Sequence, residues 1–130
     1  MLKTLKTIPV LIFTFTSCLP LGDDGINSFI KESSNKRNNK KAILFLREAG
    51  ATVSDSYQVT IMDYNNKFDK RKVGNTFTVD TDHNKAPLDS TSINFNWLSN
   101  DTLQIDYDKR LRTFIQEKNV QGVTIIYQAR

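Results

Sequence analysis

Residues 93–108 contain the pattern that most constrains the fold, an alternation of apolar and polar side chains in two adjacent runs. The apolar members are Ile93, Phe95, Trp97, Leu103, Ile105 and Tyr107. Successive side chains of a strand point to opposite faces, so this period predicts two half-buried strands. Pairing Trp97 with Leu103 brings all six to one face. That register predicts a hairpin with a three-residue loop, in which one residue, such as Asn100 or Asp101, is left-handed.

Three further strands are predicted before this hairpin. Residues 42–46 form a nearly continuous apolar run, which is typical of a strand buried on both faces. Residues 57–61 alternate, and residues 76–79 resemble a short strand. Charged or polar loops, at 65–72 and 80–90, separate these elements.

A second hairpin is predicted near the C-terminus. Residues 113–118 and 123–128 flank a turn that contains Gly122, a residue suited to a positive φ. In this pairing Phe114 faces Tyr127 and Ile115 faces Ile126. We therefore expect a mainly β domain of about five or six antiparallel strands in meander order. The pattern leaves open whether the sheet is curled, a small sandwich or a partial barrel.

The only cysteine, Cys18, stands where a lipid anchor would be attached. Lys3 and Lys6 give a positive start, residues 8–15 are apolar, and small residues precede the cysteine. This order is typical of a secretory signal, and the run is shorter than the ~20 residues of a membrane span. Phe15-Thr16-Ser17-Cys18 resembles a bacterial lipobox, although Phe15 departs from its aliphatic preference. The alternative is an ordinary signal that is cleaved elsewhere.

These features predict three segments in one small protein. Residues 1–17 are expected to be a lipoprotein-type signal peptide, residues 18–41 a lipid-anchored polar and flexible linker, and residues 42–130 the β domain. The expected location is the bacterial cell envelope, at its periplasmic or surface face, with acyl chains on Cys18 in the membrane. With one cysteine no intramolecular disulfide is possible, so the core must hold the fold.

Charge gives limited information about partners. The chain has 18 Lys and Arg against 14 Asp and Glu, a net charge of +4. The expected signal contains Lys3 and Lys6 and no acid, so the mature chain is near +2, which is too weak to indicate nucleic-acid binding. The basic pairs Lys36-Arg37 and Lys40-Lys41 are interpreted first as part of a solvated linker. The more specific interpretation is a polybasic patch that contacts anionic lipid, in which each charge near the surface contributes about 1 kcal/mol of binding free energy.

The sequence has no recognisable catalytic or metal-binding motif, and no cofactor is expected. Asp80-Thr81-Asp82-His83-Asn84 resembles the start of a calcium loop. Lys85 replaces the required glycine and Thr91 replaces the closing glutamate, so we favour a turn. Asp106 and Asp108 could serve as paired carboxylates, but two solvated charges beside Lys109 and Arg110 explain them more simply.

Several stretches together resemble an uncharacterised bacterial domain family found in small, often lipid-anchored envelope proteins. They are residues 41–52, 57–61 and 97–107, with Gly122-Val123, Ile125 and Tyr127 at the end. The resemblance covers roughly residues 41–127 and implies no known activity. It therefore adds no catalytic residue to those considered above.

Three functions remain open. The leading hypothesis is a non-enzymatic envelope lipoprotein, a protein-binding or structural module whose free sheet face or edge contacts an unidentified envelope protein. An immunity or inhibitor role is one form of it. The alternative is a small-ligand binder whose mouth is formed by the loops at 48–56 and 80–90. The third, and least favoured, is a hydrolase that uses Asp106, Asp108 and His83.

Overall fold

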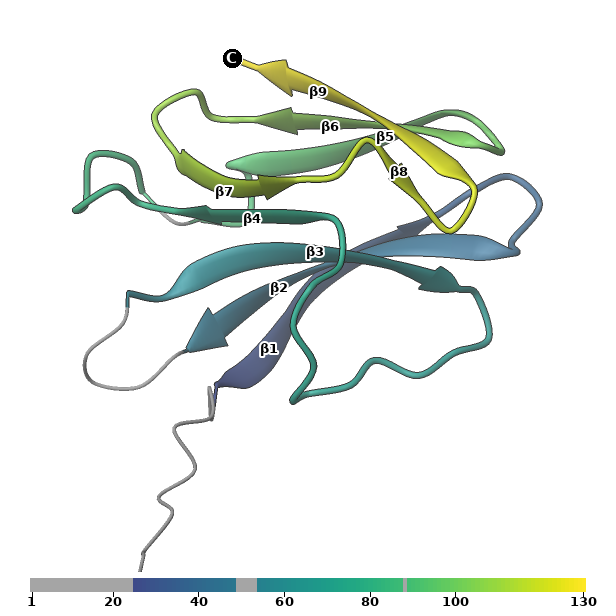
Figure 1. Cartoon of the computed structure of the whole chain (residues 1–130), viewed down its shortest axis with the longest axis horizontal. Coiled ribbons are helices and arrows are strands. Elements are labelled where there is room, and N and C mark those ends of the chain that lie inside the picture. The colour runs from purple at the N-terminus through teal and green to yellow at the C-terminus, as the bar shows by residue number, and fades with distance from the viewer. Residues whose placement is uncertain (1–24, 49–53, 88) are drawn as a thin grey trace, which may run out of the picture.

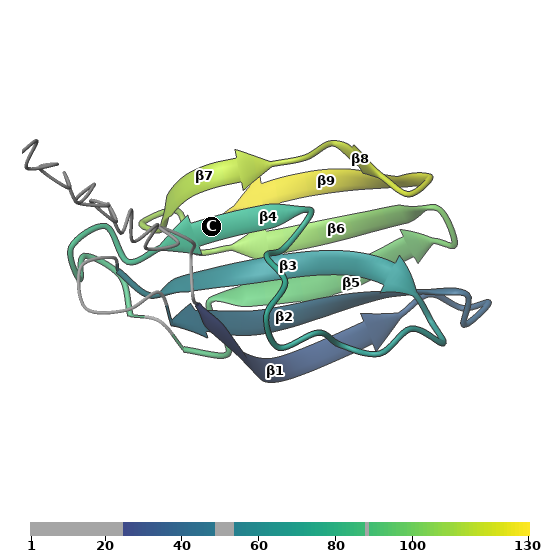
Figure 2. The ribbon, with the colours of Figure 1, turned by 60° about the horizontal axis from the view of Figure 1, so that its bottom comes forward.

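Two β-sheets pack face to face in the computed structural model, which describes residues 25–48, 54–87 and 89–130 (Figures 1 and 2). Sheet A contains, in spatial order, β1 (Ile26–Ser34), β2 (Lys40–Glu48), β3 (Ser56–Asp63), β4 (Phe77–Asp80) and β7 (Arg112–Gln116). Sheet B contains β5 (Ile93–Ser99), β6 (Thr102–Tyr107), β9 (Val123–Ala129) and β8 (Asn119–Val120). The mainly β, antiparallel prediction is confirmed, and of the three architectures left open the chain adopts the sandwich.

The topology is richer than a meander of five or six strands. The described part of the chain holds nine strands, and it passes from sheet A to sheet B after β4, back to sheet A for β7, and again to sheet B. Most neighbours are antiparallel, but β6 and β9 run parallel. A meander was expected because alternation marks each strand without identifying its neighbour.

The core lies between the sheets and contains the predicted hairpin face. The register is the predicted one, with Trp97 opposite Leu103. Ile93, Leu103 and Ile105 are fully buried, whereas Trp97 is half-buried at the rim. There the Trp97 indole Nε1 donates a hydrogen bond of 3.1 Å to the Ser33 carbonyl of β1. The indole therefore closes the side of the sandwich where β5 faces β1.

The predicted loop of this hairpin is wrong in detail. The turn has two residues, Asn100 and Asp101, and neither has a positive φ. The third residue is accommodated by a bulge at Leu98, which has no partner between the pairs Trp97–Leu103 and Ser99–Thr102. The bulge therefore replaces the left-handed loop residue that the three-residue loop was expected to contain.

The second hairpin was assigned to the wrong strands. β7 pairs with β4 of sheet A, with Ile115 opposite Thr78, and does not pair with β9. The actual hairpin joins the short β8 to β9 through Gln121 and Gly122, whose φ angles are 50° and 79°. Two successive positive φ values are typical of a tight type I′ turn. The glycine was predicted correctly, but a two-residue strand was too short to recognise.

The expected linker is largely folded. Residues 26–34 form β1 at the edge of sheet A, and β2 begins at Lys40. Polar residues are stable here because their side chains find fixed partners. Lys31 Nζ, for example, donates to the Ser90 carbonyl at 2.7 Å and to Asn94 Oδ1 at 3.1 Å, which joins β1 to sheet B. The part of the chain before Gly25 lies outside the described residues.

The connection between β3 and β4, residues 64–76, crosses the outer face of sheet A (Figure 2). We call this segment the strap. Its Phe68 ring lies 5.3 Å from Phe45 and 6.0 Å from Phe29, measured between ring centroids. The strap explains why both faces of β2 are buried, as the continuous apolar run predicts: one face meets sheet B and the other meets the strap.

Asn27 of β1 fixes the strap from beneath. This side chain is 2% exposed, and its Nδ2 donates to the carbonyls of Asp69 at 3.0 Å and Lys72 at 2.6 Å. Its Oδ1 accepts a hydrogen bond of 2.8 Å from Arg47. The buried amide thus replaces the backbone partners that a loop on a sheet face would otherwise lack.

We predict that Asn27→Ala lowers the free energy of unfolding by about 3 kcal/mol, because it leaves several buried polar groups unsatisfied. Urea titration of the purified protein measures the loss. The matched control is Asn96→Ala on the exposed face of β5, which should change stability by less than about 0.5 kcal/mol. Equal losses in both variants would mean that the strap contributes little to stability.

Candidate functional site

Sheet B has one face that no described segment covers. Its other face meets the core. The strap covers the outer face of sheet A over β2, whereas β7 at the edge of sheet A is exposed along its length. In Figure 1 the free face is the upper surface of the molecule, over β5, β6 and β9. A sheet with one open face offers a surface on which a partner can lie.

This open surface is rich in side-chain amides, and we call it the amide face. Strand register places Asn94, Asp106 and Gln128 in one row across β5, β6 and β9. The next row contains Asn96, Gln104 and Ile126, whose apolar side chain is 44% exposed. The rows form because residues two apart along a strand share a face. The surface therefore offers hydrogen-bond donors and acceptors around one apolar group.

Hydrogen bonds between side chains fix part of the amide face. Gln104 Nε2 donates to Asp106 Oδ1 at 2.7 Å and to Gln128 Oε1 at 3.0 Å. Arg130, after the end of β9, donates from Nη2 to Asp106 Oδ2 at 2.5 Å. Contacts of this kind, along a strand and between neighbouring strands, restrict the side chains before a partner arrives, which reduces the entropy lost on binding.

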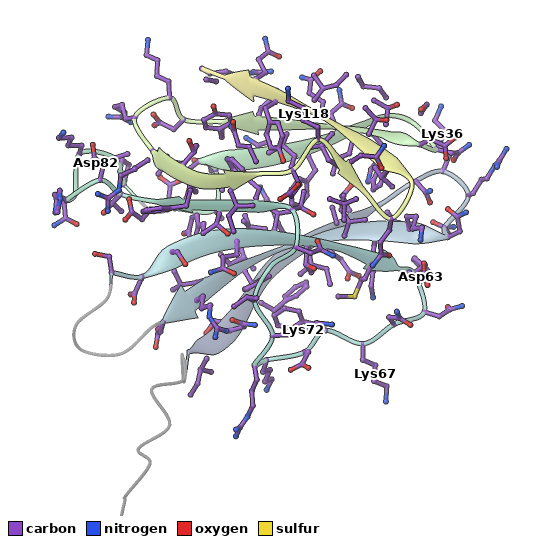
Figure 3. The ribbon with its side chains drawn as sticks, viewed as in Figure 1. Lys36, Asp63, Lys67, Lys72, Asp82 and Lys118 are labelled. Carbon is purple, nitrogen blue, oxygen red and sulfur yellow. The ribbon has the colours of Figure 1, made fainter. Side chains whose placement is uncertain are left out.

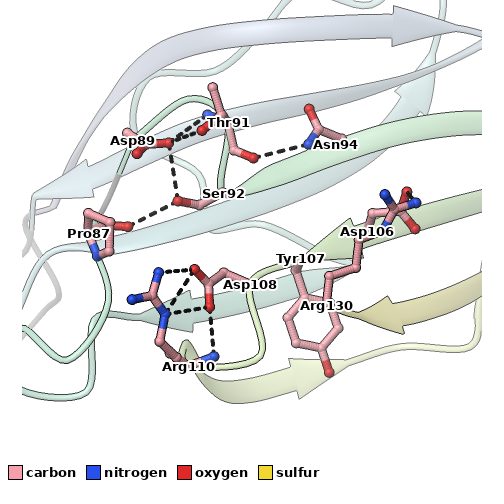
Figure 4. A pocket seen from close by; sticks show the side chains of 10 residues that line it. All are labelled: Pro87, Asp89, Thr91, Ser92, Asn94, Asp106, Tyr107, Asp108, Arg110 and Arg130. Atoms are coloured by element: carbon pink, nitrogen blue, oxygen red, sulfur yellow. Dashed lines mark hydrogen bonds and ion pairs between the residues drawn. The ribbon is translucent and has the colours of Figure 1, made fainter.

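A polar hollow lies at one end of the amide face, and Figure 4 shows its lining. Asp106 and Asp108 both line it, as the paired-carboxylate hypothesis required. Each is already held by an arginine, Asp106 by Arg130 and Asp108 by Arg110. The Arg110 guanidinium donates to Asp108 at 2.6 and 3.0 Å and, with its own backbone N–H, lowers the pKa of Asp108 to about 2. A carboxylate stabilised in its charged form is a poor general acid or base near neutral pH.

His83 does not join these carboxylates. It lines a second, open hollow with Ser54 and Asp55 of the β2–β3 connection and with Thr81 and Asn84. The described parts of the two loops proposed as a ligand mouth, which exclude residues 49–53 and 88, therefore lie side by side. The three groups proposed for a hydrolase are divided between two hollows.

The calcium-like stretch forms a turn with an unusual backbone. Asp82, His83 and Asn84 have φ angles of 48°, 59° and 65°, a left-handed conformation that Asp and Asn tolerate best. Asp80 accepts hydrogen bonds from Arg112 at 2.6 and 3.1 Å. Burial opposes ionisation of Asp80, but these bonds prevail and its pKa is lowered. The described residues contain no group of three or more His, Cys, Asp or Glu side chains arranged to hold a metal.

Sequence reasoning found half of this site. Alternation in residues 93–108 predicted which side chains of β5 and β6 face away from the core. The contribution of β9 was missed because residues 123–128 were paired with the wrong strand. A parallel neighbour leaves no turn signal in the sequence, so no local pattern reveals it. Cys18, the predicted lipidation site, lies outside the described residues.

Comparisons with known proteins returned no relative. No protein-family model, no curated protein and no solved structure matches the chain. Within the described ranges, no helix has the length and apolar character needed to cross a membrane.

We predict that Asp108 titrates with a midpoint near pH 2, below its ordinary value of 3.8. Its lowered pKa means that ionised Asp108 favours the folded state; this contribution is present above about pH 4 and is lost as the pH falls toward 2. Carboxyl-carbon NMR measures the midpoint. Arg110→Gln should raise it toward 3.8, whereas Arg112→Gln, which removes the partner of Asp80, should leave it unchanged.

Proposed function

We propose that this chain is a non-enzymatic lipoprotein of the bacterial envelope that binds another envelope protein through its amide face. The observation that carries the proposal is the uncovered face of sheet B, with two aligned rows of polar side chains around Ile126. Protein interfaces of moderate affinity combine hydrogen-bonding groups with a few apolar contacts, as this face does. Inhibition of an envelope-active toxin is one function such a surface could serve.

The irregular edge strands of both sheets favour a partner that binds to a sheet face over one that adds a strand to an edge. β1, β5 and β7 each carry one unpaired extra residue, Ile30, Leu98 and Phe114 respectively. The fourth edge, β8, has only two residues. Bulges and short strands interrupt the row of free backbone groups that an added strand would need. A partner that extends either sheet is therefore disfavoured relative to one that lies on the amide face.

A membrane anchor is the second part of the proposal. It is supported by the order of residues 1–18: lysines, an apolar run, small residues and Cys18. Acylation of the Cys18 sulfur and of the new α-amine would provide stable attachment.

Ligand binding is the second candidate function, and one observation favours it. Ser54 and Asp55 share an open hollow with Thr81, His83 and Asn84, as a mouth built from these two loops requires. The hollow is polar and wide, so a hydrophilic ligand would suit it best. The amide face carries the stronger proposal because hydrogen bonds between several of its side chains hold them in place.

We predict that Cys18→Ala moves the protein from the membrane pellet to the soluble fraction, because the acceptor of the acyl chains is removed. Immunoblotting of fractionated cells measures the distribution. Thr16→Ala, which keeps a small residue before the cysteine, is the control and should remain in the pellet. Retention of Cys18→Ala in the pellet after a salt wash would show that another segment provides the anchor.

We predict that Ile126→Arg reduces partner capture at least tenfold, because a large charge in place of the exposed apolar group of the amide face blocks close contact. Crosslinking in intact membranes, followed by purification and mass spectrometry, measures capture. The matched control is Ile115→Arg on β7, where the isoleucine is similarly exposed, 40% against 44%. Both variants should unfold at the same urea concentration as the wild type. Equal capture by both variants would rule out the amide face as the binding surface.

A further inference from the structure

The positive charge of the described residues is concentrated on the strap. Residues 64–76 contain four cations, Lys67, Lys70, Arg71 and Lys72, against one acid, Asp69. All other described residues together contain twelve cations and eleven acids, so they are close to neutral. Figure 3 shows Lys67 and Lys72 on the side of the molecule opposite Lys118.

The strap cations differ from the basic pairs that the sequence suggested for lipid contact. Lys40 lies 2.5 Å from Asp63, and Lys41 lies 3.8 Å from Glu32 and over the Tyr64 ring. In contrast, no ion pair within the described residues involves the four strap cations. Their charge is therefore available to an external anion.

The backbone of the strap holds these cations outward. The carbonyls of residues 69 and 72 accept hydrogen bonds from the Asn27 amide, and that of Lys70 accepts one of 2.7 Å from the Asn27 backbone. The Arg71 carbonyl accepts one of 3.2 Å from Arg47. Four successive carbonyls thus bond to groups beneath the strap. The backbone that carries Lys70, Arg71 and Lys72 is therefore held in place, so it does not have to become ordered on binding.

Apolar side chains accompany the cations on the same face. Phe29, which packs against Phe68 of the strap, is 52% exposed, and Val73 of the strap is 53% exposed. A surface that combines lysines and arginines with exposed apolar groups matches the interface of a membrane, where phosphate headgroups meet acyl chains.

The short stretch of chain between Cys18 and β1 also favours a membrane lipid as the ligand of the strap. Because β1 begins at Ile26, only seven residues separate it from Cys18, in place of the long linker that the sequence suggested. Fully extended, they reach at most about 25 Å. Asn27, which binds the strap, is the second residue of β1. A chain anchored at Cys18 therefore enters the domain next to the strap cations.

We propose that the strap, together with Phe29, lies on the anionic headgroups of the membrane that holds the lipid anchor. This inference rests on the proposed anchoring at Cys18 and adds the orientation of the domain. The basic groups and Phe29 face the lipid, and the amide face, on the opposite sheet, is turned away from the membrane toward protein partners.

Lipid preference of the acylated protein tests the proposal. The protein is presented from dilute detergent to an equal mixture of two preformed vesicle populations, one of phosphatidylcholine alone and one with about 30 mol% phosphatidylglycerol. The vesicles are then separated and the bound protein is measured. Since the acyl chains are the same in every sample, a difference between populations reports the headgroup contact of the folded domain.

Two variants of equal charge make the comparison specific. The strap variant changes Lys67, Lys70, Arg71 and Lys72 to glutamine. The control variant changes four exposed lysines elsewhere, Lys36, Lys85, Lys109 and Lys118, to glutamine. We expect the wild type and the control to prefer anionic vesicles at least tenfold, and the strap variant to lose most of this preference. Salt at about 0.5 M should abolish it in all three, because it screens the charges.

Equal preference in the two variants would overturn the proposal, because total charge and not the strap would then set lipid binding. Loss of capture of an acidic protein by the strap variant, without any lipid preference in the wild type, would also overturn it and assign the strap to that protein. Failure of the anchor is distinguishable, since mass spectrometry would then show no acyl chains on Cys18 of the purified protein.

Discussion

The buried guanidinium of Arg47 is the constraint on which the outer half of the molecule depends. Arg47 is 2% exposed on the outer face of β2, where its strand partners are Asn27 and Ser56. A charge in such a place is stable only when its donors are matched, here by Asn27 Oδ1 and the Arg71 carbonyl among others. Gly25 packs against the same group, since a Cβ there would lie 2.7 Å from the Arg47 Cζ. The start of β1, the strap and the second face of β2 therefore depend on one side chain.

This arrangement gives a small sandwich a third layer. The core between the sheets stabilises their inner faces, while Phe45 on the outer face is shielded by Phe68 of the strap. Gly74 and Asn75 return the strap to the sheet. The Asn75 side chain accepts from the Ile61 N–H at 2.9 Å and donates to its carbonyl at 2.8 Å, as a neighbouring strand would. A Cβ at Gly74 would approach the Val59 carbonyl oxygen to 2.8 Å, so this close return requires glycine.

The alternation of apolar and polar residues predicted which side chains of a strand face the core, but it did not predict which strands are neighbours. The register of β5 and β6 follows from alternation, because a shift by one residue would expose Ile93 and Ile105. β7 was paired with the wrong strand, because its actual neighbour β4 lies more than thirty residues earlier in the sequence. β1 was not recognised because its polar composition resembles a linker. The groups that order it, Arg47 of β2 and Asn94 of β5, are distant in the sequence. For the same reason, the sequence predicted only the part of the amide face on β5 and β6. The part on β9 joins through a parallel pairing with β6, a strand distant in the sequence.

The bulges at Ile30, Leu98 and Phe114 have a consequence for crowded conditions. Proteins held on a bilayer meet one another in two dimensions, at far higher local concentration than in bulk solution, and their sheets can approach side by side. Regular open edges would then join laterally into continuous intermolecular sheets. An extra residue in each of three edge strands, and a fourth edge of two residues, breaks the hydrogen-bond spacing that such growth needs. On a membrane, where the anchor proposed above would hold it, the domain would resist this edge-to-edge growth even at high surface density.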